Sequence, residues 1–206
     1  PVQRKNPITG LFCASYLAIR SRSWDLLHAH SRVPAWIAWW ASVLSGIPWV
    51  MTAHALYSRN AGLAPLSRAK GVICVSPAVR KHLEEHLPPH IVVIPNGLPP
   101  TSTRWEGRGF PDNPRFLFVG RLTRIKGLDT VIRALEPLAN REWILDVIGD
   151  GPQRAELEAL SRKLNLGAHI VFHGFRNDSA AWMARSGCLL FPSLSEGMGL
   201  VVMEAL

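Results

Sequence analysis

Short apolar segments typical of β-strands alternate with amphipathic helical segments along almost the whole chain. The strand segments are nearly continuous in apolar residues, as expected for parallel strands covered on both faces, and the helices between them supply the crossovers that such strands require. The expected strands are residues 24–29, 47–53, 71–76, 91–95, 115–120, 143–149, 169–174 and 188–193. The expected helices are residues 34–46, 77–87, 127–139, 152–166 and 179–187. This order of elements predicts the α/β class.

A segment poor in hydrophobic periodicity and rich in Pro, Gly and polar residues interrupts this alternation at residues 96–114. We therefore predict two α/β domains, residues 1–98 and 115–206, joined by a linker over residues 99–114. The chain has 206 residues, of which 48% are hydrophobic, enough for two small cores. A ligand of such a pair is expected at the carboxyl ends of the strands or in the cleft between the domains.

Neither end of the sequence looks like a natural terminus. The first residue is Pro1 rather than Met, and the last five residues, VMEAL, begin a helix without a stop signal. We expect the intact protein to continue at both ends.

Positive charge is concentrated in the first half of the chain. Residues 1–100 contain 10 Lys and Arg against 3 Asp and Glu, whereas residues 101–206 contain 13 against 12. A surplus of this kind suits an anionic partner, such as a membrane surface, a phosphorylated sugar lipid or nucleic acid. An ordinary solvated basic face is the alternative interpretation.

Cysteine usage and hydropathy indicate an intracellular protein. Cys13, Cys74 and Cys188 are far apart and lack the close spacing of a zinc site, so we expect buried, reduced thiols. No segment reaches the roughly 18 consecutive apolar residues of a bilayer-spanning helix, and the basic residues near the start are not followed by a secretory core.

Two basic residues follow the expected strand 115–120. Arg121 lies at its carboxyl end, and Lys126 lies five residues later, at the start of the next helix. A guanidinium fork and an ammonium beside a helix N-terminus can together bind a diphosphate. The alternative is an ordinary basic loop.

The chain closes with two carboxylates, Glu196 and Glu204, that bracket seven uncharged residues. Gly197 and Gly199 permit close backbone approach ahead of a helix expected to begin near Leu200, so this loop can form an anion site. Glu204, on the second turn of that helix, can accept hydrogen bonds from a diol. Glu196 has a simpler alternative role, in which it stabilises the helix dipole.

Taken together, four stretches in this order and spacing resemble the nucleotide-sugar-dependent glycosyltransferases of family 4, which have the GT-B fold. They are FVGRLTRIKGLDTVIRAL, LDVIGDGPQRAELEAL, IVFHGF and the motif with the two glutamates. In the first half, HAHSRVPAWIAWW, GIPWVMTAH, ICVSPAVRKHL and VIPNGL look like the acceptor-side domain of that family.

The resemblance implies two Rossmann-like domains that face a central cleft, a nucleotide sugar held by the second domain, and sugar transfer with retention of anomeric configuration. It assigns Glu204 to the ribose hydroxyls, Glu196 to the donor sugar, and Arg121 and Lys126 to the diphosphate. The other donor-binding positions that it implies are Gly120, Gly174, Phe175, Arg176, Gly197, Met198, Gly199 and Leu200.

In the first domain, His54 matches a family histidine that faces the donor sugar, so we count it among the catalytic residues with Arg121, Lys126 and Glu196. His30, Ser31 and Arg32 are expected on the acceptor side. The strand face of His28 depends on where its strand ends, so His28 is not included.

Chemistry without a metal or other cofactor is expected. The chain has no Asp-x-Asp motif, and Arg121 with Lys126 would stabilise the charge on the departing diphosphate. No enzymic nucleophile is evident, so the resemblance favours attack by the acceptor on the same face of the sugar.

We therefore predict a retaining, metal-independent glycosyltransferase that moves sugar from a nucleoside diphosphate to a glycan or glycolipid acceptor in cell-surface polysaccharide or lipopolysaccharide biosynthesis. It is expected in the cytoplasm, peripherally at the inner membrane face, with an anionic membrane surface but no nucleic acid as partner. The alternatives are a relative of the sucrose or trehalose synthases or phosphorylases, and a non-catalytic nucleotide-sugar-binding remnant.

One helical stripe carries a separate expectation. Trp36, Trp40 and Val43 fall on one side of the expected helix, which suits core packing, with membrane contact as the alternative.

Overall fold

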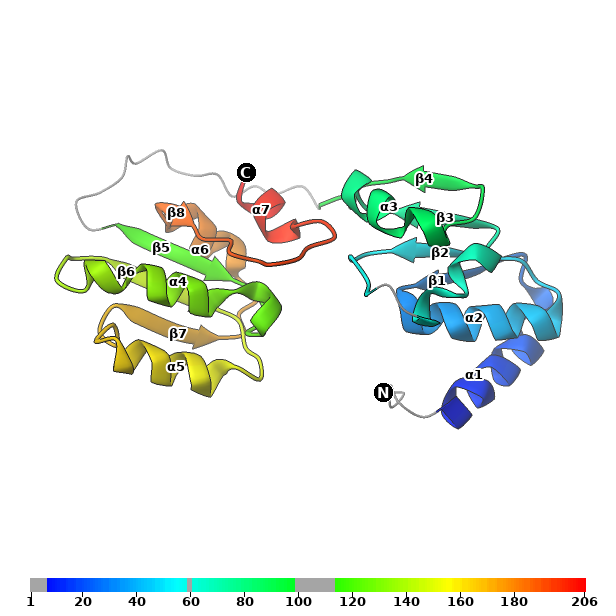
Figure 1. Ribbon diagram of the computed structural model, residues 1–206, viewed down its shortest axis with the longest axis horizontal. Coiled ribbons are helices and arrows are strands. Elements are labelled where there is room, and N and C mark those ends of the chain that lie inside the picture. Colours follow the sequence, from blue (N-terminus) through cyan, green and yellow to red (C-terminus); the bar gives the residue numbers. More distant parts are fainter. Residues whose placement is uncertain (1–6, 59–60, 99–113) are drawn as a thin grey trace. The chain divides into compact units, whose positions relative to one another are not determined.

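The protein is described by a computed structural model that covers residues 7–58, 61–98 and 114–206 (Figure 1). Its chain divides into two compact units. The first comprises Pro1–Gly97 with Glu196–Met198, and the second comprises Leu98–Ser195 with Gly199–Leu206. The expected linker, residues 99–114, lies outside the described residues apart from Pro114.

The first unit contains a four-stranded parallel sheet in the order β1-β2-β3-β4. Its strands are β1 (Leu27–His30), β2 (Trp49–Ala53), β3 (Gly71–Cys74) and β4 (Ile91–Val93). Its helices are α1 (Pro7–Arg20), α2 (Arg32–Ser45) and α3 (Pro77–Leu83). Short 3-10 turns are η1 (Ser21–Ser23), η2 (Ala61–Leu63), η3 (Leu66–Arg68) and η4 (Glu84–His86). Consecutive strands are neighbours, so helical segments connect each strand to the next as in βαβ units.

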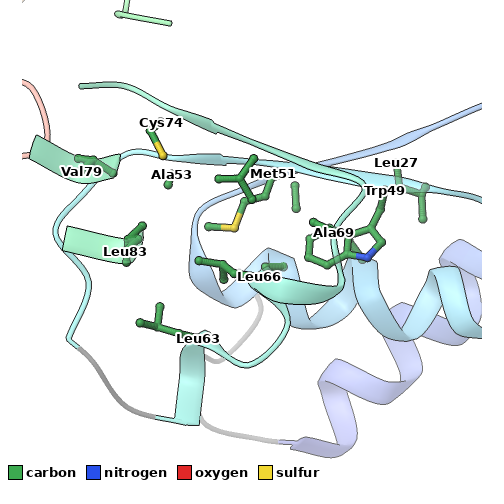
Figure 2. Packing of buried hydrophobic residues seen from close by; sticks show 14 of the residues in the cluster. Leu27, Trp49, Met51, Ala53, Leu63, Leu66, Ala69, Cys74, Val79 and Leu83 are labelled. Carbon is green, nitrogen blue, oxygen red and sulfur yellow. The ribbon is translucent and has the colours of Figure 1, made fainter. Parts of the chain in front are cut away.

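One face of this sheet carries the core of the first unit. Trp49 and Met51 of β2 are 2% and 0% exposed, and they pack with Leu63, Leu66 and Leu83 from the helical segments (Figure 2). Alternation along the strands places successive side chains on opposite faces, which explains why every second residue of β2 enters this cluster.

The opposite face of the same sheet is less covered than the sequence predicts. Val50 and Ile73 are half-buried, and Val92 is 50% exposed. Within the described residues, this face of the first sheet is therefore only partly covered.

Helix α2 buries small residues instead of aromatic ones. Its buried residues are Ala35, Ala38 and Ala41. Trp40 and Val43 are 43% and 59% exposed, so the expectation that they form a core-facing stripe with Trp36 is wrong. Alanines at this spacing allow α1 and α2 to pack against each other closely, which large side chains would prevent.

The second unit contains another four-stranded parallel sheet, in the order β7-β6-β5-β8. Its strands are β5 (Arg115–Val119), β6 (Ile144–Ile148), β7 (Ile170–Gly174) and β8 (Cys188–Leu189). Its helices are α4 (Leu128–Ala134), α5 (Arg154–Lys163), α6 (Ser179–Arg185) and α7 (Leu200–Ala205). Two 3-10 turns are η5 (Arg124–Lys126) and η6 (Glu136–Leu138).

Helices cover both faces of the second sheet. On one face, Ile132 of α4 and Leu157 of α5 are buried in the same cluster as Leu145 of β6. On the other, Trp182 of α6 is buried against Leu117 of β5. Here the sequence prediction is confirmed.

All eight expected strands are present, several of them shorter than predicted. The largest differences are the first, which begins at Leu27 instead of residue 24, and the last, which pairs only over Cys188–Leu189. Helix α1 was not predicted.

The cysteines are free, and Cys74 is buried whereas Cys13 and Cys188 are half-buried.

Candidate functional site

The carboxyl edge of the second sheet gathers several of the predicted donor-binding residues. Gly120 and Arg121 directly follow β5, and Gly174 ends β7 and is followed by Phe175 and Arg176. Because β5, β6 and β7 are parallel, these loops emerge at the same edge of the sheet. The structure thus brings together positions that are more than fifty residues apart in sequence.

Arg121 and Lys126 are held by the turn that connects β5 to α4. Lys126 ends η5, and its backbone N–H donates to the carbonyl of Thr123 at 2.9 Å. The aliphatic stem of Lys126 reaches back over Gly120, since a Cβ added there would lie 4.0 Å from Lys126 Cδ. Arg121 is exposed. The prediction that these two cations bind one diphosphate stays a prediction.

The loop after β6 positions the turn that carries Arg121 and Lys126. None of the residues of this loop was predicted to belong to the site. Leu122 N–H donates to the carbonyl of Asp150 at 2.9 Å, and Gln153 N–H donates to the carbonyl of Leu122 at 3.1 Å. A Cβ at Gly149 would lie 1.9 Å from the carbonyl oxygen of Gly120. The glycine-rich GDG sequence was the available signal, because close backbone contact requires glycine.

The loop after β7 presents an open surface. Phe175 is 78% exposed, and the guanidinium of Arg176 donates from Nε and from a terminal nitrogen to the Asp178 carboxylate at 2.9 and 2.8 Å. This hydrogen-bonded pair lowers the pKa of Asp178 to about 2. Together with Asn177 these residues line a shallow hollow of about 420 Å³.

The closing motif is divided between the two units. Helix α7 begins at Leu200, as predicted, directly after Gly199, and Glu204 lies exposed on it. Glu196 groups instead with the first unit, together with Gly197 and Met198. The two glutamates therefore belong to different units, and their common role stays a prediction.

In the first unit, histidines gather at the carboxyl ends of β1 and β2. His30 Nδ1 and His54 Nε2 share a hydrogen bond of 3.0 Å, and their rings stack with centroids 5.3 Å apart. His28 lies beside them, with its ring 4.3 Å from His30 and its Nε2 bonded to Thr52 Oγ1 at 2.8 Å. His28 and His30 share the exposed face of β1, so His28 belongs to the cluster from which we had excluded it.

Partial burial lowers the pKa of His54, with a smaller contribution from the nearby His30. The same cause lowers the pKa of His28, with smaller contributions from the two neighbouring imidazoles. Both shifts favour the uncharged form of the two imidazoles.

The predicted acceptor-side residues continue from this cluster. Ser31 adopts a φ of 80°, which is uncommon for a residue other than glycine, and its N–H donates to the Thr52 carbonyl at 3.1 Å. The guanidinium of Arg32 donates to Ser58 Oγ at 3.0 Å. The structure therefore brings His30, Ser31, Arg32 and His54 together.

The part of the chain that the structure describes contains neither a metal-binding cluster nor a membrane-spanning helix. Among those residues, no His, Cys, Asp and Glu side chains form a group of three or more suited to a metal ion. None of the described helices has the length and apolar character needed to cross a bilayer.

The sequence matches two models of known protein families. The family model described as "Glycosyl transferases group 1" matches residues 102–206, and the one described as "Glycosyltransferase Family 4" matches residues 3–102. The uncharacterised glycosyltransferase MJ1178 of Methanocaldococcus jannaschii is 31% identical over 201 residues, covering 91% of this chain and 55% of that protein. The chain thus spans little more than half the length of that relative.

Two solved structures share the fold. The apo form of the lipopolysaccharide outer core galactosyltransferase WaaB has a TM-score of 0.71 at 20% identity, covering 96% of this chain and 58% of that one. HepE of Anabaena, in complex with UDP and glucose, has a TM-score of 0.76 at 22% identity, covering 93% and 59%. The predicted α/β class and GT-B type of fold are confirmed. The group 1 model matches the half of the sequence that carries Arg121 and Lys126, and the family 4 model matches the other half, so this chain belongs to the group 1, family 4 glycosyltransferases.

Proposed function

We propose that the protein transfers a sugar from a nucleoside diphosphate to a glycan or glycolipid acceptor in the synthesis of a cell-surface polysaccharide or lipopolysaccharide. The observation that carries this proposal is the turn at the carboxyl edge of the second sheet, where Arg121 and Lys126 lie beside Gly120. Family membership supports sugar transfer, WaaB supports a lipopolysaccharide-type acceptor, and the complex of HepE supports a nucleoside diphosphate.

In this mechanism the residues of the second unit hold the leaving group. Arg121 and Lys126 stabilise the negative charge that develops on the diphosphate as the glycosidic bond breaks, in place of a metal ion. Glu204 accepts hydrogen bonds from the ribose hydroxyls, and backbone groups of Gly199 and Leu200 bind phosphate or sugar oxygens. The exposed loop that contains Phe175 and Arg176 contacts the base.

In the first unit, His54 faces the donor sugar as a neutral imidazole, and its hydrogen bond to His30 fixes its orientation. Glu196 contacts the donor sugar beside the reacting carbon. The acceptor hydroxyl attacks on the same face from which the diphosphate leaves, so the anomeric configuration is retained.

The Glu204→Ala variant is expected to bind the nucleoside diphosphate more weakly by about 1 to 3 kcal/mol, because ribose hydroxyls would lose their charged acceptor. Calorimetric titration with UDP measures the difference. Glu142→Ala is the matched control, since Glu142 is also exposed but precedes β6 at the amino edge of the sheet. Equal affinity of the two variants would leave Glu204 with a role in the helix alone.

We propose that the first unit contacts an anionic membrane surface at the cytoplasmic face. Its basic surplus is joined by exposed apolar side chains on α1 and α2, among them Phe12 (73%), Ile19 (67%) and Val43 (59%). Charge attracts the unit to acidic headgroups, and apolar side chains can enter the interface.

Association with acidic vesicles is expected to fall as salt shortens the Debye length from about 10 Å at 0.1 M to about 3 Å at 1 M. Co-sedimentation with vesicles that contain phosphatidylglycerol measures it, with phosphatidylcholine vesicles as the control. The same recovery with both lipids at low salt would contradict the membrane proposal without affecting sugar transfer.

A further inference from the structure

A buried carboxylate lies at the centre of the second sheet, outside the residues that the proposed mechanism uses. Asp146 is in the middle of β6 and is 0% exposed. Its two oxygens accept hydrogen bonds from Arg115 Nε at 2.5 Å and from a terminal nitrogen of Arg115 at 3.1 Å. His173 Nε2 donates the third bond, at 2.6 Å. A buried charge is tolerated only when it is paired in this way, so both partners are held firmly.

His173 lies at a β-bulge of β7, two residues after Val171, the partner of Asp146. Asp146 pairs with Val171, and Val147 pairs with Phe172, but Ile148 pairs with Gly174. His173 is therefore an extra residue of β7 that has no partner on β6. Bulges redirect side chains and occur often beside functional sites.

Trp182 links this network to the exposed loop. The imidazole of His173 lies 4.3 Å from the Trp182 ring, which is 7% exposed. On the loop side, the guanidinium of Arg176 lies 5.9 Å from the same ring and forms the hydrogen-bonded pair with Asp178. A continuous set of contacts thus runs from the buried Asp146 to the residues that line the hollow of about 420 Å³.

The chain turns sharply between the network and the loop. Gly174 directly follows His173 with a φ of 72°, and its carbonyl accepts a hydrogen bond of 2.8 Å from Gly149 N–H. The backbone conformation of Gly174 and its hydrogen bond to Gly149 together set the direction in which the loop leaves the sheet.

We infer that His173 is a positioning residue, which through its bond to Asp146 and its contact with Trp182 fixes the loop over residues 174–178 in the form that receives the base of a nucleoside diphosphate. The inference rests on the proposed function, because it assumes that the protein binds such a diphosphate. His173 itself does not touch the ligand. Its loss should affect recognition of the nucleoside and spare recognition of the phosphates.

The decisive variant is His173→Phe. It keeps a ring beside Trp182 but removes the hydrogen bond to Asp146. His173→Gln restores an N–H donor at nearly the position of Nε2 and serves as the conservative rescue. The matched control is His169→Phe, since His169 stands at the other end of β7, stacks on Trp143 at 4.5 Å and bonds to the carbonyls of Trp143 and Ala139.

Affinities for UDP, ADP, GDP and inorganic pyrophosphate are measured by calorimetry on each variant, after thermal unfolding has confirmed that it is folded. We expect His173→Phe to bind the preferred nucleoside diphosphate about tenfold more weakly, as for loss of one hydrogen bond to a charged group. Pyrophosphate affinity should stay the same, His173→Gln should recover most of the loss, and His169→Phe should bind both probes normally.

Three results would overturn the inference: an equal loss for pyrophosphate, an equal loss in His169→Phe, or no loss in His173→Phe. If His173→Phe does not fold, the same affinities are measured on Asp146→Asn and judged by the same criteria. This variant keeps the shape of the side chain and weakens the same hydrogen bond. An unsubstituted protein that binds none of the diphosphates would refute the proposed function itself. Normal binding that is insensitive to these substitutions would refute only the positioning role.

Discussion

Replacement of Lys126 by Ala is expected to slow sugar transfer by about 10²- to 10³-fold, the usual scale for removing one group that stabilises developing negative charge. Lys126 is half-buried at the end of η5, and its stem lies over Gly120 at the carboxyl end of β5. This support fixes the position of the ammonium. In the Ala variant, water cannot supply a positive charge at the same position. Donor turnover under saturating acceptor measures the effect.

The same assay separates the cation-pair mechanism from metal catalysis. If Arg121 and Lys126 supply the positive charge, a chelator leaves the rate nearly unchanged, and Arg121→Lys slows the reaction because an ammonium cannot form the bidentate fork. Lys163→Ala, which removes an exposed charge at the end of α5, is the control. Activity that disappears with EDTA and returns with Mg²⁺ or Mn²⁺ would contradict this mechanism. A protein that binds the diphosphate without any turnover would instead be a binding module.

The second large effect is expected in the fold of the second unit, where Gly149→Ala should lower the free energy of unfolding by about 3 to 5 kcal/mol. Gly149 has a φ of 134°, which side chains other than glycine rarely adopt. Its added Cβ would lie 1.9 Å from the carbonyl oxygen and 2.9 Å from the carbonyl carbon of Gly120. Both contacts are with backbone, so the loops after β5 and β6 would have to separate.

Gly167→Ala is the control for this prediction, because the nearest atom to its added Cβ is Arg162 Cγ, at an ordinary 3.6 Å. Denaturant unfolding followed by the protection of the β5 and β6 amides against hydrogen exchange reports on this unit. If both variants unfolded at the same denaturant concentration, the loops after β5 and β6 would not be in this close contact.

Periodicity along the sequence predicted most of the fold because strand and helix patterns reflect burial directly. It failed where two burial patterns compete on one helix. In α2 both the alanines and the tryptophans recur at helical spacing, and the choice between them depends on how closely α1 approaches. Helix α1 itself was missed, although Ala14 and Ala18 mark its buried side at a spacing of four.

Parts of the candidate site were predicted for a different reason. Arg121 and His54 follow strand ends closely, so the position of each strand end locates them, and Lys126 lies in the turn that follows β5. Asp146 and His173 could not be found in this way. Asp146 reads as a single polar residue in an apolar strand, and its bond to His173 depends on the register between β6 and β7, which no local sequence signal specifies.

The loops after β6 and β7 differ in how freely their sequences can change during evolution. Gly149 and Gly151 lie against the backbone of Gly120 and Leu122, with no room for another atom. Phe175, by comparison, is 78% exposed. New side chains can therefore be sampled in the loop after β7 while the neighbouring loop is held constant, so the surface that we propose for base recognition can vary without loss of the scaffold.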